Sequence, residues 1–334
     1  MYNKVAIVGV GLMGGSLGLA LKARRLAREV AGWGRNEERL ESARRLGALD
    51  RWTLSREEAL AGADLLVFAT PIGATAALAA EWLPAASPGC RITDLMSVKG
   101  DLPSRLTALT GPSRSYVSSH PLCGSEKTGV ESARADLFAG RLCLLTPVAK
   151  TKKPALAALQ ALWQGLGMRV ISLAPARHDQ ILAAVSHLPH LVAAALINRL
   201  GEERLLAFAG TGLLDATRIA ASDSDLWSEI VLENRREVLH ALGLFRETLD
   251  RVRRLIEAGE PAALRGWLGT AARRRQAMDL ASRAPRAPRA PLAPLAPASG
   301  TGASAARPRR VGAGGKNPKE PRRKRPRLPP PVKL

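Results

Sequence analysis

The sequence predicts an α/β domain with a doubly wound, mostly parallel sheet, followed by an all-helical domain and a disordered C-terminal tail. Short apolar runs alternate with amphipathic stretches over residues 1–173, which is typical of parallel strands joined by helices. The strand signals then stop, and residues 174–282 are rich in Ala and Leu with helical periodicity. From residue 283 an Ala-Pro-Arg repeat replaces this pattern, so the last segment cannot build a core.

The same patterns place each element. The apolar runs predicted as strands are residues 5–8, 30–33, 65–69, 91–94, 116–119, 143–146 and 169–173. The helices predicted between them are residues 12–27, 37–46, 56–60, 75–83, 101–109 and 154–166. In the second domain the predicted helices are residues 178–200, 225–258 and 261–282, with breaks near Gly201 and at residues 210–212. Such a helical domain can bury a wide apolar face against a second copy of itself, so we expect a homodimer.

The composition excludes several classes of protein. The three cysteines, Cys90, Cys123 and Cys143, form no CxxC pair, which argues against a zinc ribbon or a disulfide scaffold and favours the reducing cytoplasm. The apolar stretch after Lys4 contains five glycines, and no small-residue cleavage site precedes Lys22, so we do not expect a signal peptide. No other apolar run approaches about 18 uninterrupted residues, so we expect no membrane span.

The net charge of +21 is concentrated in the tail. Residues 283–334 contain 14 Lys or Arg, one acid and 12 of the 23 prolines, so the preceding 282 residues carry only +8. The tail has no aromatic residue for base stacking, and any binding to nucleic acid would be independent of sequence and sensitive to salt. A polyanion-binding role for the tail therefore stays open beside that of a solubilising extension.

A glycine-rich turn, Gly9-Val10-Gly11-Leu12-Met13-Gly14, directly follows the first predicted strand and opens a helix. Gly9 permits the tight turn, Gly11 lets the backbone approach a pyrophosphate, and Gly14 lets the helix pack closely on the strand. The helix N-terminus, at Leu12 and Met13, offers unpaired N–H groups to the phosphates. The strand-turn-helix context predicts a dinucleotide-binding Rossmann domain.

The end of the second predicted strand usually distinguishes NAD from NADP. An acid there favours NAD, and a basic side chain favours the 2′-phosphate of NADP. This chain has Gly34-Arg35-Asn36 and no acid. Arg35 either pairs with a phosphate, stacks on adenine or is an ordinary solvated arginine, so the residues leave the cofactor choice open.

Two loops are candidates for the reaction site. Residues 94–100 contain Ser97, and residues 119–127 contain His120; each loop follows a predicted strand at the carboxyl edge of the sheet. In parallel sheets that edge faces the ligand crevice, so the hydroxyl and the imidazole can meet near a nicotinamide. A structural histidine is the alternative for His120.

Two further groups lie in the helical domain. Ser186-His187-Leu188-Pro189-His190 interrupts an apolar helix, where proline predicts a kink and the histidines either cap it or face the interdomain cleft. No carboxylate motif accompanies them, so we predict no metal site. Arg218 suits a substrate carboxylate, and an ion pair with Asp215 is the alternative.

With these residues in hand, the chain resembles the prephenate/arogenate dehydrogenase family from about residue 4 to about residue 280. The combination of HPxxGxEKxG with a downstream SHLPH is especially specific. The segments that carry the resemblance, in order, are VGVGLMGGSLGLALK, TDLMSVKG, SSHPLCGSEKTGVE, DLFAG, HDQILAAVSHLPHLVAAAL, ATRIAASD and LWSEIVLEN.

The resemblance implies a Rossmann domain at residues 1–173 and a helical substrate and dimerisation domain at residues 174–282. The family does not require the disordered basic tail that the composition predicts at residues 283–334. It implies NAD as first choice, with NADP possible because Gly34 replaces an acid that many members have. The substrate would be prephenate, arogenate or both, and prephenate would be oxidised and decarboxylated to 4-hydroxyphenylpyruvate. The resemblance assigns catalysis to His120, its positioning to Ser97, substrate contact to His190, a substrate carboxylate to Arg218, and the site entrance to Glu126.

Overall fold

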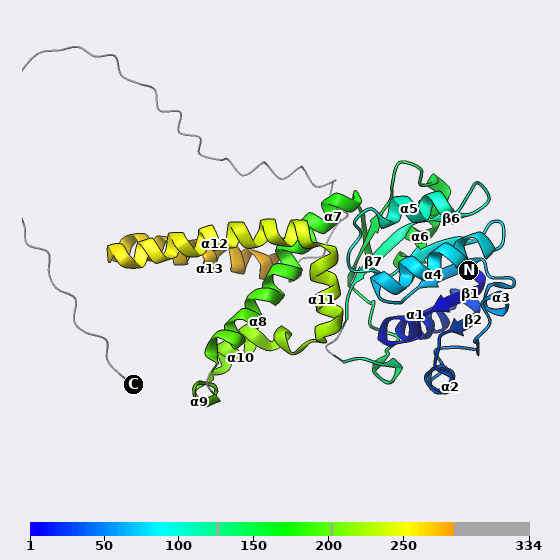
Figure 1. Cartoon of the computed structure of the whole chain (residues 1–334), viewed down its shortest axis with the longest axis horizontal. Helices are drawn as coiled ribbons and strands as arrows, with labels where there is room; N and C mark the ends of the chain where they lie inside the picture. Colours follow the sequence, from blue (N-terminus) through cyan, green and yellow to red (C-terminus); the bar gives the residue numbers. More distant parts are fainter. Residues whose placement is uncertain (125–126, 202, 284–334) are drawn as a thin grey trace, which may run out of the picture. The chain divides into compact units, whose positions relative to one another are not determined.

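The computed structural model describes residues 1–124, 127–201 and 203–283. Its first part is built on a six-stranded sheet in the order β3-β2-β1-β4-β5-β6, in which every paired strand is parallel. This confirms the predicted doubly wound sheet. Its strands are β1 (Tyr2–Val8), β2 (Ala27–Trp33), β3 (Arg51–Thr53), β4 (Leu65–Phe68), β5 (Arg91–Asp94) and β6 (Ser115–Tyr116). Figure 1 shows this part in blue to blue-green, with β1 and β2 labelled beside α1 (Leu12–Ala23).

Both faces of this sheet are buried. Successive side chains of a strand point to opposite faces, so Val5 and Ile7 join one apolar cluster while Ala6 and Val8 join another. The two clusters explain why the strands are continuous apolar runs rather than alternating ones. The helices connecting the strands are α1 (Leu12–Ala23), α2 (Glu37–Arg45), α3 (Arg56–Leu60), α4 (Ile72–Ala85) and α5 (Leu102–Leu109).

A second, three-stranded sheet corrects the sequence prediction. Its strands β7 (Ser118–Leu122), β8 (Leu142–Thr146) and β9 (Arg169–Ser172) pair in that order, β7 antiparallel and β9 parallel to β8. The single strand predicted at 116–119 therefore divides, because the chain leaves β6 and pairs with a different partner from Ser118 onward. Apolar patterns predict that a segment is extended, but long-range contacts choose its partner. The short helix η1 (Val130–Ser132) and α6 (Lys153–Gly165) complete this part.

The remainder is helical, as predicted, with two differences. Residues 175–200 form α7 (Pro175–Leu182), a π-helical turn η2 (Ala183–His187) and α8 (Leu188–Leu200). Pro189 has no N–H to donate to the preceding turn, and the π turn accommodates that loss. The helix predicted at 225–258 divides at Asn234. The other elements are α9 (Glu203–Leu206), α10 (Thr211–Thr217), η3 (Arg218–Ala221), α11 (Ser224–Glu233), α12 (Arg235–Ala258) and α13 (Pro261–Arg283).

The contacts group residues 1–265 into one compact unit, and the described residues after it, 266–283, belong to a second. The domain boundaries expected at 173 and 282 stay predictions. Of the predicted basic tail, residues 284–334 lie outside the described residues.

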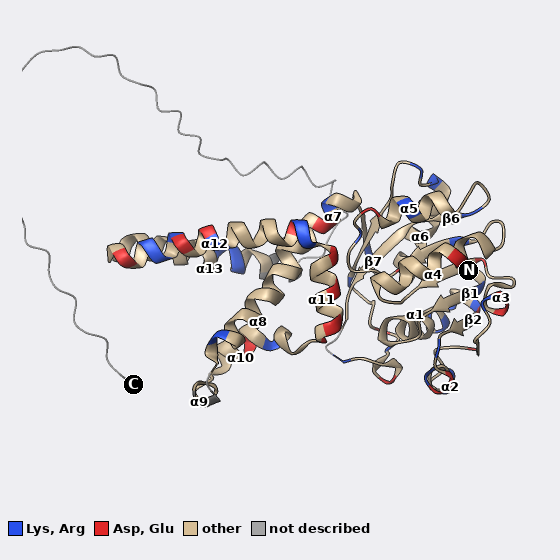
Figure 2. Ribbon diagram, in the orientation of Figure 1, with Lys and Arg blue, Asp and Glu red and all other residues tan. Residues whose placement is uncertain are grey.

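One helical run meets the length and hydropathy of a membrane span. An 18-residue stretch within Pro175–Leu200 has a mean hydropathy of 1.6, and Figure 2 shows α8 with almost no charged residues. Its buried side chains include His178, Asp179, His187 and His190, however, and it contacts η3 and α12. Buried polar groups that pair within the protein favour a helix of the folded domain over a lipid-facing one.

Candidate active site

The glycine turn between β1 and α1 has the geometry of a dinucleotide cradle. Gly9 has a φ of +90°, which a side chain would strain, and a Cβ at Gly14 would lie 2.1 Å from the Gly9 oxygen. Gly11 is the N-cap of α1, with no side-chain hydrogen bond there and open space where its Cβ would be. The turn lies at the carboxyl end of β1, where the strand order reverses toward β4. These residues therefore fit a pyrophosphate group.

The flanks of this turn have clear local roles. Leu12 and Met13 pack their side chains against the core cluster, so only their backbone is suited to face phosphate. At the end of β2, the Asn36 side chain accepts a hydrogen bond from the Arg39 N–H and caps α2. Arg35 beside it is exposed.

His120 lies within β7 and not in a loop after a strand, which corrects the sequence prediction. It pairs with Leu144 of β8, and only 9% of its surface is exposed. The preceding residue of β7 is held in place by hydrogen bonds. The Ser119 hydroxyl bonds to the Thr93 hydroxyl at 2.7 Å and accepts the Trp163 indole N–H at 3.0 Å. The imidazole is therefore mounted on regular, rigid structure.

A buried ion pair joins the loop of Ser97 to this strand. The Lys99 ammonium bonds to Asp94 Oδ1 at 3.0 Å and to the carbonyl oxygens of Met96 and Ser119, each at 2.8 Å. All three of its donors are thereby used, and both charged side chains are fully buried. Ser97 is half-buried within this braced loop, two residues before Lys99, whose ammonium reaches the strand that carries His120.

His120 is the first member of a hydrogen-bonded series that crosses into the helical region. Its Nδ1 lies 2.8 Å from Nε2 of His178, whose Nδ1 lies 2.7 Å from Oδ1 of Asp179. Burial, together with the neighbouring His178 and Lys99, holds the pKa of His120 well below its usual range. Burial also lowers the pKa of His178, although Asp179 opposes that shift. Both imidazoles are therefore neutral at pH 7.

A second pair of histidines surrounds Trp227. His190 stacks on this ring with centroids 3.5 Å apart and an interplanar angle of 7°, and His187 meets it edge-on at 6.1 Å. The Asn234 amide donates to His187 Nδ1 at 3.2 Å and to the Asp179 carbonyl at 2.9 Å, which connects the two groups of histidines. Burial lowers the pKa of His187 to about 4 and also lowers that of His190.

The buried Nδ1 of His190 has no hydrogen-bond partner among the described residues. An unpaired, buried ring nitrogen is costly, and a ligand atom would relieve that cost. His190 is therefore suited to contact a substrate.

Among the described residues, no hydrogen bond joins the other predicted substrate group, Arg218, to this network. Arg218 is exposed at the start of η3, a turn that packs against α8, and over the described residues it forms no ion pair with Asp215. Glu126 lies outside the described residues. Within the same part of the chain, no group of three His, Cys, Asp or Glu side chains is arranged to hold a metal ion.

Sequence reasoning missed several residues of the site. For Asp94, Lys99 and Asp179 the available signal was a charged residue close to apolar neighbours, which must be paired if it is buried. The missed residues are Asp94, Lys99, Tyr116, His178, Asp179 and Asn234.

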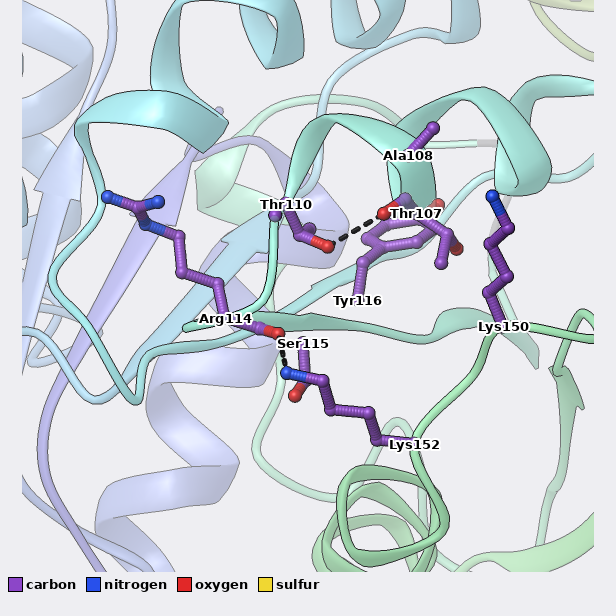
Figure 3. A pocket seen from close by; sticks show the side chains of 9 residues that line it. Thr107, Ala108, Thr110, Arg114, Ser115, Tyr116, Lys150 and Lys152 are labelled. Atoms are coloured by element: carbon purple, nitrogen blue, oxygen red, sulfur yellow. Dashed lines mark hydrogen bonds between the residues drawn. The ribbon is translucent and has the colours of Figure 1, made fainter.

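A separate pocket of about 230 Å³ offers less chemistry (Figure 3). Two of its three cationic side chains are already engaged, since Lys152 donates to the Arg114 carbonyl at 2.8 Å and Arg114 donates to the Pro84 carbonyl at 2.7 Å. The Tyr116 hydroxyl donates to Asp94. We therefore place the candidate active site at the histidine network.

Comparison with known proteins identifies two domains of one family. The nucleotide-binding domain of prephenate dehydrogenase matches residues 17–172, and its dimerization domain matches residues 174–270. The first match begins after Gly14, so the role of the glycine turn rests on its geometry and context.

Three relatives share most of their length with this chain. A cyclohexadienyl dehydrogenase of Zymomonas mobilis is 34% identical over 77% of this chain and 89% of its own. Prephenate dehydrogenase from Aquifex aeolicus, solved with hydroxyphenyl propionate and NAD+, is 33% identical with a TM-score of 0.79, over 83% of this chain and 98% of its own. Arogenate dehydrogenase from Synechocystis is 29% identical with a TM-score of 0.72, over 82% and 99%. The sheet, the nucleotide cradle and both domain matches therefore agree, and the chain belongs to the prephenate/arogenate dehydrogenase family of oxidoreductases.

Proposed function

We propose that this enzyme oxidises and decarboxylates prephenate to 4-hydroxyphenylpyruvate, in the route to tyrosine, with NAD+ as its preferred acceptor. The observation that supports it best is His120, a buried imidazole kept neutral by its surroundings and bonded through Nδ1. An enzyme that is specific for arogenate, or that takes both substrates, is the second candidate. The relatives include proteins with each of these specificities.

His120 acts as the base of this reaction. The substrate ring carries a hydroxyl on the carbon that loses hydride, so positive charge develops there in the transition state. A neutral imidazole that accepts the hydroxyl proton stabilises that charge, an effect of about 10²–10⁴-fold. Loss of carbon dioxide from the opposite ring carbon then leaves an aromatic ring. The nicotinamide, when bound, supplies the hydride acceptor.

The substrate's two carboxylates call for donors. His190 offers its unpaired Nδ1, and because its pKa is lowered it acts as a neutral hydrogen-bond donor. Arg218 supplies a planar, charged guanidinium that can donate two hydrogen bonds to a carboxylate, and it forms no ion pair with Asp215. We assign Ser97 the orientation of substrate beside His120, and Glu126 a place at the site entrance. The excess of basic residues in the body favours approach of a dianion.

The cofactor preference follows from two features. The glycine turn suits either dinucleotide, and the relative solved with NAD+ supports NAD as first choice. Gly34 places no acid against a 2′-phosphate, and the exposed Arg35 is free to approach one. We therefore expect NADP to be tolerated.

The enzyme acts as a homodimer in the cytoplasm. The match to the family's dimerization domain and the exposed apolar side chains of the helical region support self-association. The cysteines of the described residues are free thiols, as in a reducing compartment.

Steady-state assays of prephenate and arogenate, each with NAD+ and NADP+, test the proposal. We expect the largest kcat/KM with prephenate and NAD+, and product absorbance that matches 4-hydroxyphenylpyruvate. Larger kcat/KM with arogenate would establish the second candidate, and turnover of neither would overturn both.

A further inference from the structure

The proposed reaction uses His120 but leaves unexplained the two buried groups behind it. His178 is fully buried, and Asp179 is 5% exposed. The Asp179 carboxylate also accepts the backbone N–H of Lys99 at 3.0 Å and of Gly100 at 2.7 Å. Consequently the carboxylate is held in one orientation by the same loop that carries Ser97.

When both rings are neutral, only one assignment of protons to the ring nitrogens satisfies every hydrogen bond in this series. A carboxylate that accepts two N–H groups has no proton to give, so Nδ1 of His178 carries the proton between them. Nε2 of His178 then has a lone pair, and Nδ1 of His120 must donate to it. In turn, this leaves the lone pair of His120 on Nε2.

We propose that His178 and Asp179 are positioning residues that hold His120 in its Nδ1–H tautomer, with the Nε2 lone pair presented to the substrate hydroxyl. This inference rests on the proposed function. When Nε2 accepts the hydroxyl proton, the Nδ1–H bond to His178 and the Asp179 carboxylate beyond it stabilise the imidazolium formed. The proton comes from the substrate hydroxyl and stays on His120 until solvent removes it.

Other charged groups face the same two rings and also shift their pKa values, so a test of pH dependence must leave these residues unchanged. Asp94 approaches from the end of β5, Lys99 from the loop after it, and His187 from η2. Lys99 and His187 disfavour a proton on His120, whereas Asp179 favours one on His178. Removing Asp179 should therefore lower the apparent pKa of the acid limb of kcat/KM.

The test compares Asp179→Asn with His178→Leu and His178→Gln. An amide in place of Asp179 can donate to His178 Nδ1, which would reverse both tautomers, and we expect kcat to fall about 10²-fold or more with KM changed only a few-fold. Leu should be equally harmful. Gln retains an oxygen that can accept from His120 Nδ1, so it should restore kcat to within about tenfold of wild type.

Two matched variants control for folding. Asp64 also accepts two successive backbone N–H groups, those of Asn3 at 2.9 Å and Lys4 at 3.1 Å, but its segment lies between α3 and β4. Asp64→Asn should cost comparable thermal stability without the loss of kcat. His240, exposed on α12, provides a histidine control as His240→Gln.

A measurement without substrate separates this inference from the proposed function. Nitrogen-15 NMR of histidine-labelled protein distinguishes a protonated from an unprotonated ring nitrogen. We expect the Nδ1–H form for His120 and His178 in the wild type, and Nε2–H forms in Asp179→Asn. The Nε2–H form of His120 in the wild type, or normal kcat in Asp179→Asn, would overturn the inference. Turnover of neither substrate alongside the expected tautomers would overturn the proposed function alone.

Discussion

The two regions of this chain bury their apolar side chains to very different extents. In residues 1–173, large clusters cover both faces of the six-stranded sheet, and Phe138 and Trp163 are fully buried. Among the described helices after residue 174, the separate cluster of buried side chains contains only Ala183, Val238 and Ala241. Phe208 in this region is 86% exposed. The first region therefore carries its own core, whereas the second has apolar surface to bury elsewhere.

The two regions also contribute different parts of the site. The first supplies the cradle that fits a nucleotide and the proposed base, on a strand whose neighbours are braced by hydrogen bonds. The second supplies the groups that we propose orient this base or face the substrate, including His178, Asp179 and His190. In the proposed mechanism, reaction chemistry belongs to the well-packed region, and orientation and recognition belong to the region with less internal support.

The largest effect is expected at the base. His120→Asn should lower kcat by about 10²–10⁴-fold with a small change in KM, since the proton is accepted mainly in the transition state. The active form is neutral and its pKa is depressed, so wild-type kcat/KM should stay level around pH 7 and fall only at acidic pH. Steady-state pH profiles measure both. A near-normal kcat in His120→Asn would show that His120 is not the base and that the first region does not supply the proton acceptor.

Core truncations should differ between the regions. Phe138→Ala opens a cavity in a fully packed cluster and should reduce the free energy of unfolding by about 3–5 kcal/mol. Val238→Ala removes two methyl groups from the small helical cluster, at a cost of about 1–2 kcal/mol. Urea denaturation measures the two changes. Equal losses would contradict the claim that the helical core is the weaker one.

Recognition is expected to depend on Arg218 through KM. Arg218→Ala leaves a substrate carboxylate without a charge-assisted partner, which costs about 2–3 kcal/mol, or roughly 30–150-fold in KM where chemistry is slow relative to dissociation. Arg105→Ala removes an exposed arginine of the first region and serves as the charge-matched control. An unchanged KM for Arg218→Ala would remove Arg218 from the site.

Self-association should be sensitive to charge on the exposed apolar side chains of the helical region. Phe208→Glu would place a carboxylate at the interface from each subunit and should weaken the dimer about tenfold or more. Leu46→Glu changes an exposed leucine of the first region and should leave the dimer intact. Light scattering over a range of concentrations compares them, and equal behaviour of the two variants would show that Phe208 lies off the interface.

The smallest effect concerns the cofactor. Arg35→Ala should lower kcat/KM for NADP+ by less than about tenfold and leave that for NAD+ nearly unchanged, because an exposed arginine gains little from one charge contact. The ratio of the two constants in wild type and variant is the measurement. If the ratio does not change, Arg35 does not contact the 2′-phosphate.

Local chemistry was enough to predict the parallel sheet, the helical region and the glycine turn. A run of apolar side chains that must be buried on both faces has few alternatives to a central parallel strand. A glycine required at φ +90°, as at Gly9, leaves a direct signal in the sequence. Likewise, Pro189 marked the irregular turn inside the helix of residues 175–200, although the sequence suggested a kink and the structure shows a π turn.

Pairing between distant segments was decided only by the tertiary structure. The sequence indicated an extended segment around residue 118, but antiparallel pairing with β8 is what places His120 inside a strand. Similarly, His178 and Asp179 lie 58 and 59 residues after His120, and no local rule says that their side chains will meet it. Hydrogen bonds between buried polar groups depend on positions fixed by the whole core, so their partners emerge only when the sheet and the helices are assembled.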